Sequence, residues 1–430
     1  MTTIAMVAGI GFLLLLALGV PIYAALIGVA TALTLWDGGT LAGIGQRILD
    51  KMNSATLMAI PFFVIAAGFI RGGGMARALI DMSAAWVGRL PGGVPIAAVV
   101  ATGIFAAING SSVATALAMG TIVVPEMIKR GFDRSFALGL TAAAGTLGIL
   151  LPPSMPLVVY GLMSETSVPR LFLAGVVPGL LQMLLFSLLI LVMARHRGGR
   201  SEPFAGWRQF GKANLNALPA LVVPVVVLGG IYGGIVTVTE AAALSAAVAL
   251  LISILVYRSL RLVEIPEILV DSMARAAAIL VIVAGALVLS YWITRSGMAN
   301  DLVRWITAFD LAPWQFLLIM CGILLLMGTI LEGYAIILIT LPLTLPILDA
   351  LGIDKIHYAI IITIAIELAL LTPPVGLNLF VMAEVARAPV SEVMRGVLPF
   401  LAMMLVLLLL VVFFPGLATW LPDLVLGPAR

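Results

Sequence analysis

The stretch that most constrains the fold is residues 148–156, Gly-Ile-Leu-Leu-Pro-Pro-Ser-Met-Pro, which places three prolines in an otherwise apolar, helix-like run. Proline removes a backbone donor and disfavours helical geometry in the residue before it, so a helix cannot continue here. In hydrocarbon an unpaired N–H or C=O group is costly, and broken backbone is stable only when it is buried in protein or lines a watery site. We therefore expect a helix break at membrane depth.

The same break occurs a second time. Leu-Thr-Pro-Pro at 371–374 repeats Leu-Leu-Pro-Pro at 150–153, and other pairs such as Gly110 and Gly333 recur at nearly the same spacing. The matching residues are mostly Gly and Pro, which restrict or extend the backbone conformations available to the chain. An internal repeat of this kind is the best sequence pointer to the site of a secondary transporter.

Composition supports a membrane protein. The chain has 430 residues, of which 63% are hydrophobic and only 10% are charged, whereas soluble domains are about one-quarter charged. Cys321 is the only cysteine, which excludes an internal disulfide and a cysteine-based metal cluster. We find no catalytic residue set and no nucleotide motif, so we expect neither an enzyme nor an ATP-driven pump. The net charge of +3 indicates orientation in the membrane and not nucleic-acid binding.

The pattern predicts an all-α polytopic protein with two re-entrant hairpins and two broken helices. Two short apolar limbs flank Asn-Gly-Ser-Ser at 109–112, and Glu332-Gly333 forms the tip of the second hairpin. The broken spans are predicted over 135–164 and 356–385. Residues 4–36 form either one long kinked helix or two short ones, and residues 41–52 resemble an interfacial helix.

Four units follow from this order. The basic linker at 195–212 is predicted to be cytoplasmic. Counting membrane spans in both directions from it gives the second repeat the opposite orientation in the membrane to the first. Inverted repeats are typical of secondary transporters with a site at the midplane. The units are an N-terminal scaffold with an interfacial helix (1–52), a first inverted repeat (53–194), a linker with scaffold spans (195–274) and a second inverted repeat (275–430).

The available chemistry is oxygen coordination. The side chains of Asn109, Ser111, Ser112 and Thr372, with carbonyls freed by the proline pairs, suit a small hard cation such as Na⁺. The N-termini of half-helices, which carry the positive end of the helix dipole, suit an anionic substrate group.

Plainer interpretations compete with these. The 109–112 cluster could be a surface turn, and the proline pairs could be structural kinks, although their repetition argues against this. Glu332 is a functional candidate as an intramembrane acid, but it can instead cap the hairpin helix or pair with a neighbour. Structural hydrogen bonding is favoured for Glu367 and Glu240, and His357 is predicted to lie in a loop.

Three stretches together resemble the large membrane subunit of tripartite ATP-independent periplasmic (TRAP) transporters, and the similarity covers essentially the whole chain. They are residues 109–116, 148–161 and 367–380. The resemblance implies an elevator-type Na⁺ symporter of a bacterial or archaeal inner membrane that takes up carboxylates such as dicarboxylates or sialic acids. It also implies a periplasmic substrate-binding protein and a small membrane subunit, which we expect as a separate partner.

The resemblance also implies at least two Na⁺ sites and a substrate site. The first Na⁺ site would comprise Asn109, Ser111, Gly148, Leu151 and Pro153. The second would comprise Glu332, Gly333, Ala369, Thr372 and Pro374. The substrate would lie close to Ser111, Ser112 and Thr372.

The chain departs from the usual family pattern at three positions. Ala365 and Ala369 stand where Asn and Gly are common, and Asn109 stands where Ser is common. Ala369 can still offer a carbonyl, but Ala365 offers no side-chain ligand, so the resemblance supports the second site less strongly than the first. A stand-alone ion-coupled anion symporter of related fold and a gated channel remain as alternative functions, and the sequence does not name the carboxylate.

Overall fold

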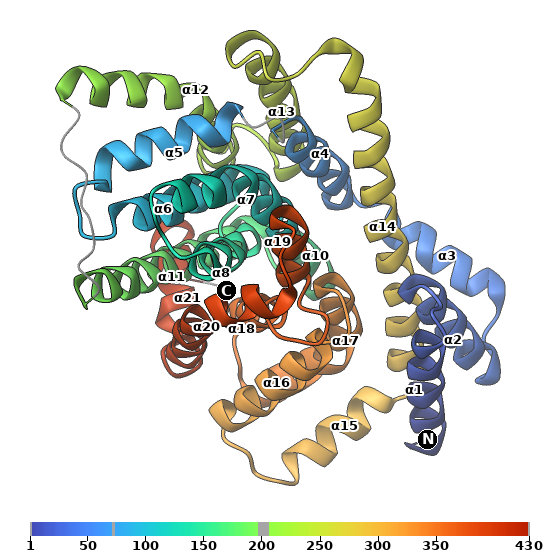
Figure 1. Cartoon of the computed structure of the whole chain (residues 1–430). Coiled ribbons are helices and arrows are strands. Elements are labelled where there is room, and N and C mark those ends of the chain that lie inside the picture. Colours follow the sequence, from blue (N-terminus) through green and yellow to red (C-terminus); the bar gives the residue numbers. More distant parts are fainter. Residues whose placement is uncertain (1, 71–73, 197–205, 429–430) are drawn as a thin grey trace.

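The computed structural model describes residues 2–70, 74–196 and 206–428, and every regular element in these ranges is a helix (Figure 1). Within these ranges, eight helical stretches are long and apolar enough to cross a membrane. A ninth span would result if α3 and α4, which meet at a bend of 65°, cross it together. The prediction of an all-α polytopic protein is confirmed.

The N-terminal region forms two short helices and not one kinked helix. They are α1 (Thr2–Ala17) and α2 (Ile22–Trp36), separated by Gly-Val-Pro at 19–21, where proline fixes the entry to α2. The amphipathic α3 (Leu41–Met52) follows, and Thr40 caps it by accepting a hydrogen bond from the Gly43 amide at 3.1 Å. α4 (Ala55–Ile70) then enters the core.

The first repeat has the predicted order of arm, hairpin and broken span. α6 and α7 form the hairpin, α8 to α10 form the broken span, and the helices are α5 (Gly74–Val87), α6 (Gly93–Asn109), α7 (Ser112–Lys129), α8 (Arg134–Gly145), α9 (Leu147–Leu150), α10 (Met155–Ser164) and α11 (Val168–His196).

The middle of the chain differs from its prediction in two places. α12 (Trp207–Tyr232) already includes residues 207–212, so the polar linker is shorter than predicted, and its residues 197–205 lie outside the described ranges. After α13 (Val238–Leu251), a π-helical turn (Ile252–Val256) and a short 3₁₀ turn (Leu262–Glu264), α14 runs over Ile265–Arg295. Proline in its first turn allows this earlier start, and the predicted unit boundary at 274 falls inside the helix.

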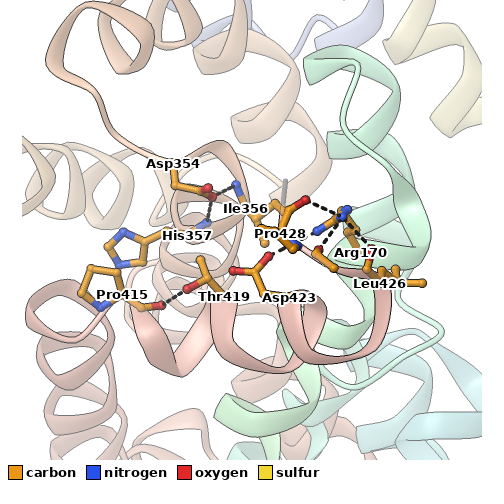
Figure 2. A network of polar contacts seen from close by, with 10 residues as sticks. Arg170, Asp354, Ile356, His357, Pro415, Thr419, Asp423, Leu426 and Pro428 are labelled. Atoms are coloured by element: carbon orange, nitrogen blue, oxygen red, sulfur yellow. Dashed lines mark hydrogen bonds and ion pairs between the residues drawn. The ribbon is translucent and has the colours of Figure 1, made fainter. Parts of the chain in front are cut away.

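The second repeat again has an arm, a hairpin and a broken span. Its helices are α15 (Met298–Thr307), α16 (Pro313–Gly328), α17 (Gly333–Leu351), α18 (Lys355–Ala369), α19 (Leu377–Ala386) and α20 (Val390–Phe413). A final helix, α21 (Gly416–Leu426), was not predicted. Figure 2 shows how Arg170 of α11 holds it: the guanidinium lies 3.3 Å from Asp423 and donates to the Leu426 carbonyl at 3.1 Å.

His357 corrects another prediction, because it lies in α18 and not in a loop. Asp354 accepts hydrogen bonds from the backbone amides of Ile356 and His357 (Figure 2), which starts the helix before the histidine. The ring is 3% exposed, and one ring nitrogen lies 2.7 Å from the Val411 carbonyl oxygen.

The two broken spans occupy the centre of the molecule (Figure 1). In the most apolar segment of Arg134–Ser164, 89% of the residues are buried. In the corresponding segment of the continuous α11, only 28% are buried. The second limb of each broken span packs against the hairpin of the other half: α10 contacts α17, and α19 contacts α7. α14 packs against α2, α4 and α17 at one side of this core.

Candidate ion and substrate site

The tip of the first hairpin directly contacts the first break. α6 ends at Asn109, and Gly110 turns the chain with φ +67°, a conformation that favours glycine. A Cβ atom on Gly110 would lie 2.5 Å from the Pro153 carbonyl oxygen. Ser111 then caps α7, its Oγ accepting from the Ala114 amide at 3.5 Å. The hairpin turn is therefore held against the proline pair by backbone contact.

Gly148 makes a second close contact between the tip and the broken span. Its backbone approaches Ser111 so closely that a Cβ atom would lie 2.6 Å from the Ser111 carbonyl oxygen and 2.9 Å from Thr115 Oγ1. Leu151 has extended geometry between α9 and the prolines. Of the five residues predicted for the first ion site, the structure brings Ser111 against Gly148, and the turn between Asn109 and Ser111 against Pro153, with Leu151 two residues before that proline.

Asn109 supplies the observation that points to a ligand here. The residue is 3% exposed, and its Nδ2 donates to Thr115 Oγ1 at 3.1 Å. Its Oδ1 is buried and has no hydrogen-bond partner among the described residues. A buried acceptor left unpaired is unfavourable, and an amide oxygen beside backbone carbonyls is the kind of ligand that a hard cation takes. These residues fit Na⁺.

The second tip and break meet differently. Gly328, near the tip, packs directly on the Ala369 methyl group at the end of α18, and a Cβ atom on Gly333 would lie 2.7 Å from Ile366 Cγ2. The Thr372 hydroxyl donates to the Leu368 carbonyl at 2.7 Å, and the Thr372 amide donates to the Ala369 carbonyl at 3.1 Å. The Ala369 carbonyl therefore already accepts one hydrogen bond, whereas the Thr372 hydroxyl gives its proton to Leu368 and keeps the lone pairs of its oxygen.

Glu332 occupies the N-cap position of α17 but makes no capping hydrogen bond with its side chain, so the capping interpretation is wrong. Its side chain is exposed. Glu240, by contrast, accepts from the Thr237 amide at 2.8 Å and the Thr237 hydroxyl at 2.9 Å, which confirms its structural role in a capping box.

Glu367 is fully buried in α18. Both carboxyl oxygens lack a hydrogen-bond partner of normal geometry among the described residues, although the Gln182 side chain of α11 lies beside them. Gln182 donates in turn to Thr146, the residue that separates α8 from α9, at 3.1 Å. The structural hydrogen bonding predicted for Glu367 is not fully formed.

Asn378 is a residue whose role the sequence did not reveal. It begins the limb after the second break, is fully buried, and donates to Ser112 Oγ at 2.8 Å and to the Ala142 carbonyl at 3.1 Å. It therefore joins the second broken span to the first hairpin tip and to α8. Its only sequence signal is an amide in an apolar run just after the proline pair.

Both hairpin tips wall one pocket of about 360 Å³, a volume typical of small-molecule sites. Ser111, Ser112, Glu332 and Gly333 line it, together with apolar residues of α4 and α14. Thr372, which was predicted to contact the substrate, is not among the described residues that line this pocket. Arg275 of α14 lines it, and the sequence analysis did not single it out.

Known proteins resemble this chain over nearly its whole length. The large permease protein DctM of a C4-dicarboxylate TRAP transporter from Pseudomonas aeruginosa is 41% identical over 92% of this chain and 93% of its own length. The large permease protein SiaM of a sialic acid TRAP transporter from Vibrio cholerae is 34% identical over 97% of this chain and 98% of its own.

The fold also resembles a solved transporter structure. The YdaH transporter of Alcanivorax borkumensis superimposes with a TM-score of 0.60 at 17% identity, covering 89% of this chain and 90% of its own. The sequence profile described as "Tripartite ATP-independent periplasmic transporter, DctM component" matches residues 10–417. The relatives are transporter permeases and not enzymes, as predicted. The chain belongs to the DctM component family of tripartite ATP-independent periplasmic transporters and is a multi-pass protein of the inner membrane.

Proposed function

We propose that this chain carries out Na⁺-coupled uptake of a carboxylate solute. The observation that carries the proposal is the pocket between the two hairpin tips. α7 begins at Ser112 and α17 begins at Gly333, so the N-termini of two helices lie at its wall. Helix N-termini favour negative charge, and the two serine hydroxyls add donors for a carboxylate.

Coupling to Na⁺ would use the oxygen atoms beside the pocket. The unpaired Asn109 Oδ1 and the carbonyls of Ser111 and Pro153 support a first ion site. The second, at Glu332, Gly333, Ala369, Thr372 and Pro374, is supported by the repeat of sequence and of hairpin-to-break packing. A bound cation next to the pocket would lower the electrostatic cost of bringing in an anion.

The movement would be an elevator motion. The hairpins and broken spans contact one another across the two halves, which favours their moving as one body. The pocket lies between this body and the walls formed by α4 and α14. Inversion of the second repeat relative to the first would give the body two related positions.

The solute would reach the permease through partners. Two relatives are named for transport of C4-dicarboxylates and of sialic acid, and both solute classes carry carboxylates. We propose that a periplasmic binding protein delivers the solute and that a small membrane subunit enlarges the static part.

Uptake of labelled carboxylates into proteoliposomes tests this function. The liposomes would contain this chain with its small subunit, with or without a Na⁺ gradient and the cognate binding protein. We expect uptake only when both are supplied. Na⁺-dependent uptake without the binding protein would favour the stand-alone symporter. Flux that follows the solute gradient and ignores both would favour a gated channel.

A further inference from the structure

One charged side chain of α14 faces the pocket. Arg275, Ala278, Ile279 and Ile282 line the pocket and follow the spacing of one helix face. The other three are apolar, so the arginine introduces a charge into an otherwise apolar wall. It lies inside a stretch that is long and apolar enough to span the membrane. A charge at such a position is expensive and marks a substrate or ion pathway by default.

The guanidinium has no partner in the part of the chain that the structure describes. Arg275 forms no hydrogen bond or ion pair there, whereas Arg295 of the same helix donates to the Tyr291 hydroxyl at 3.2 Å. No ion pair joins Arg275 to Glu332, the other charged residue that lines the pocket, in the described part of the chain. The five N–H donors of Arg275 are therefore available to a ligand.

The charge balance of the pocket also requires a cation. A carboxylate that enters would meet the Glu332 carboxyl group, and like charges repel each other. Among the described lining residues, Arg275 is the only Lys or Arg. Its planar fork matches both oxygens of a carboxylate, and such bidentate pairs are among the strongest hydrogen bonds in proteins.

We propose that Arg275 binds one carboxylate of the substrate, while the rest of the solute extends towards the serines of the first hairpin tip. This inference rests on the proposed function, because it names the residue that recognises the carboxylate. It places recognition on α14, outside the two hairpins and broken spans. Arg275 would therefore determine specificity for an acid over its neutral amide.

A ligand–protein double-mutant cycle tests this inference. Succinate and its monoamide, succinamate, would be titrated in NaCl against the purified complex of this chain and its small subunit. The proteins compared would be wild type, Arg275→Gln, Arg275→Lys and the control Arg208→Gln, an exposed arginine of α12. Na⁺-dependent thermal stabilisation would show that each variant is folded.

We expect Arg275→Gln to weaken succinate binding about tenfold or more. The same change should weaken succinamate binding much less. The preference of the protein for succinate over succinamate should therefore be largely lost. Arg275→Lys should retain part of that preference, and Arg208→Gln should retain all of it. If Arg275→Gln keeps the wild-type preference for succinate while wild-type proteoliposomes take up carboxylates, the Arg275 inference is wrong and the proposed function stands. If wild-type proteoliposomes take up none of the labelled carboxylates, both the Arg275 inference and the proposed function are wrong.

Discussion

The two breaks share a proline pair but lie in different surroundings. Residues 151–154 at the first break are all buried, whereas residues 373–375 at the second are exposed. At the first, the buried Asn109 Oδ1 lacks a hydrogen-bond partner among the described residues, and the Ser111 and Pro153 carbonyls lie where the turn contacts the break. At the second, the Ala369 carbonyl already accepts a hydrogen bond from the Thr372 amide.

The packing of the tips explains part of this difference. Gly110 and Gly148 bring backbone against backbone, which fixes the first turn rigidly. The second tip meets α18 through side chains, the Ala369 methyl group and Ile366. A repeated backbone motif therefore gives backbone contact in one half and side-chain contact in the other, which favours the first break for the proposed Na⁺ site.

Gly110→Ala should have the largest effect. The residue has a left-handed conformation that costs a non-glycine residue about 1–2 kcal/mol, and the new methyl group would collide with the Pro153 carbonyl. Displacement of the tip by about 1 Å can lower a rate by about 100-fold. We expect uptake in proteoliposomes to fall to that degree. Near-normal uptake would show that the contact between tip and break is not needed.

Asn378→Ala tests the link between the halves. The change leaves the buried Ser112 hydroxyl and the Ala142 carbonyl without their donor. We expect the free energy of unfolding to fall by about 1–3 kcal/mol, measured by thermal unfolding in detergent. Asn300→Ala, at an exposed position of α15, is the control. Equal stability of the two variants would contradict the role given to Asn378.

Gly328→Ala tests the side-chain contact of the second half. The added methyl group would overlap that of Ala369, and overpacking of this kind costs about 1 kcal/mol or more. Adding Ala369→Gly removes the overlap and should restore most of the lost unfolding temperature. Failure of the double variant to recover would mean that the cost arises elsewhere.

Gly333→Ala, the counterpart of Gly110→Ala in the second half, should have the smallest effect. Its methyl group would meet Ile366 Cγ2 at 2.7 Å and no backbone atom, so one β-branched side chain, stiff at χ1, would have to shift. We expect uptake to fall clearly less than in Gly110→Ala, because Gly333 has no left-handed φ and its methyl group meets a side chain and not a carbonyl oxygen. A loss as large as that of Gly110→Ala would abolish the distinction between the two tips.

The backbone of the site was predictable, but its side-chain pairings were not. Proline pairs and glycine turns act locally, so the breaks at 152–153 and 373–374 and the hairpin tips could be located from sequence. Asn378 and Arg275 gain their roles from residues far away in the chain, and no local pattern encodes such contacts. The start of α12 inside the polar linker and the separate α21 likewise depend on packing, of α12 against α5 and α13 and of α21 against α11.

Thermal unfolding of the purified complex with its small subunit, in NaCl against KCl and choline chloride, tests the central claim most directly. A ligand at about 100 times its Kd stabilises a protein by about 2.7 kcal/mol. We predict that Na⁺ alone raises the unfolding temperature of wild type. Asn109→Ala should remove most of this shift, and Thr372→Val should remove less, because Thr372 is partly exposed and lies beside an exposed proline pair. An equal shift in KCl, or a wild-type shift in Asn109→Ala, would contradict a preorganised Na⁺ site at the first break.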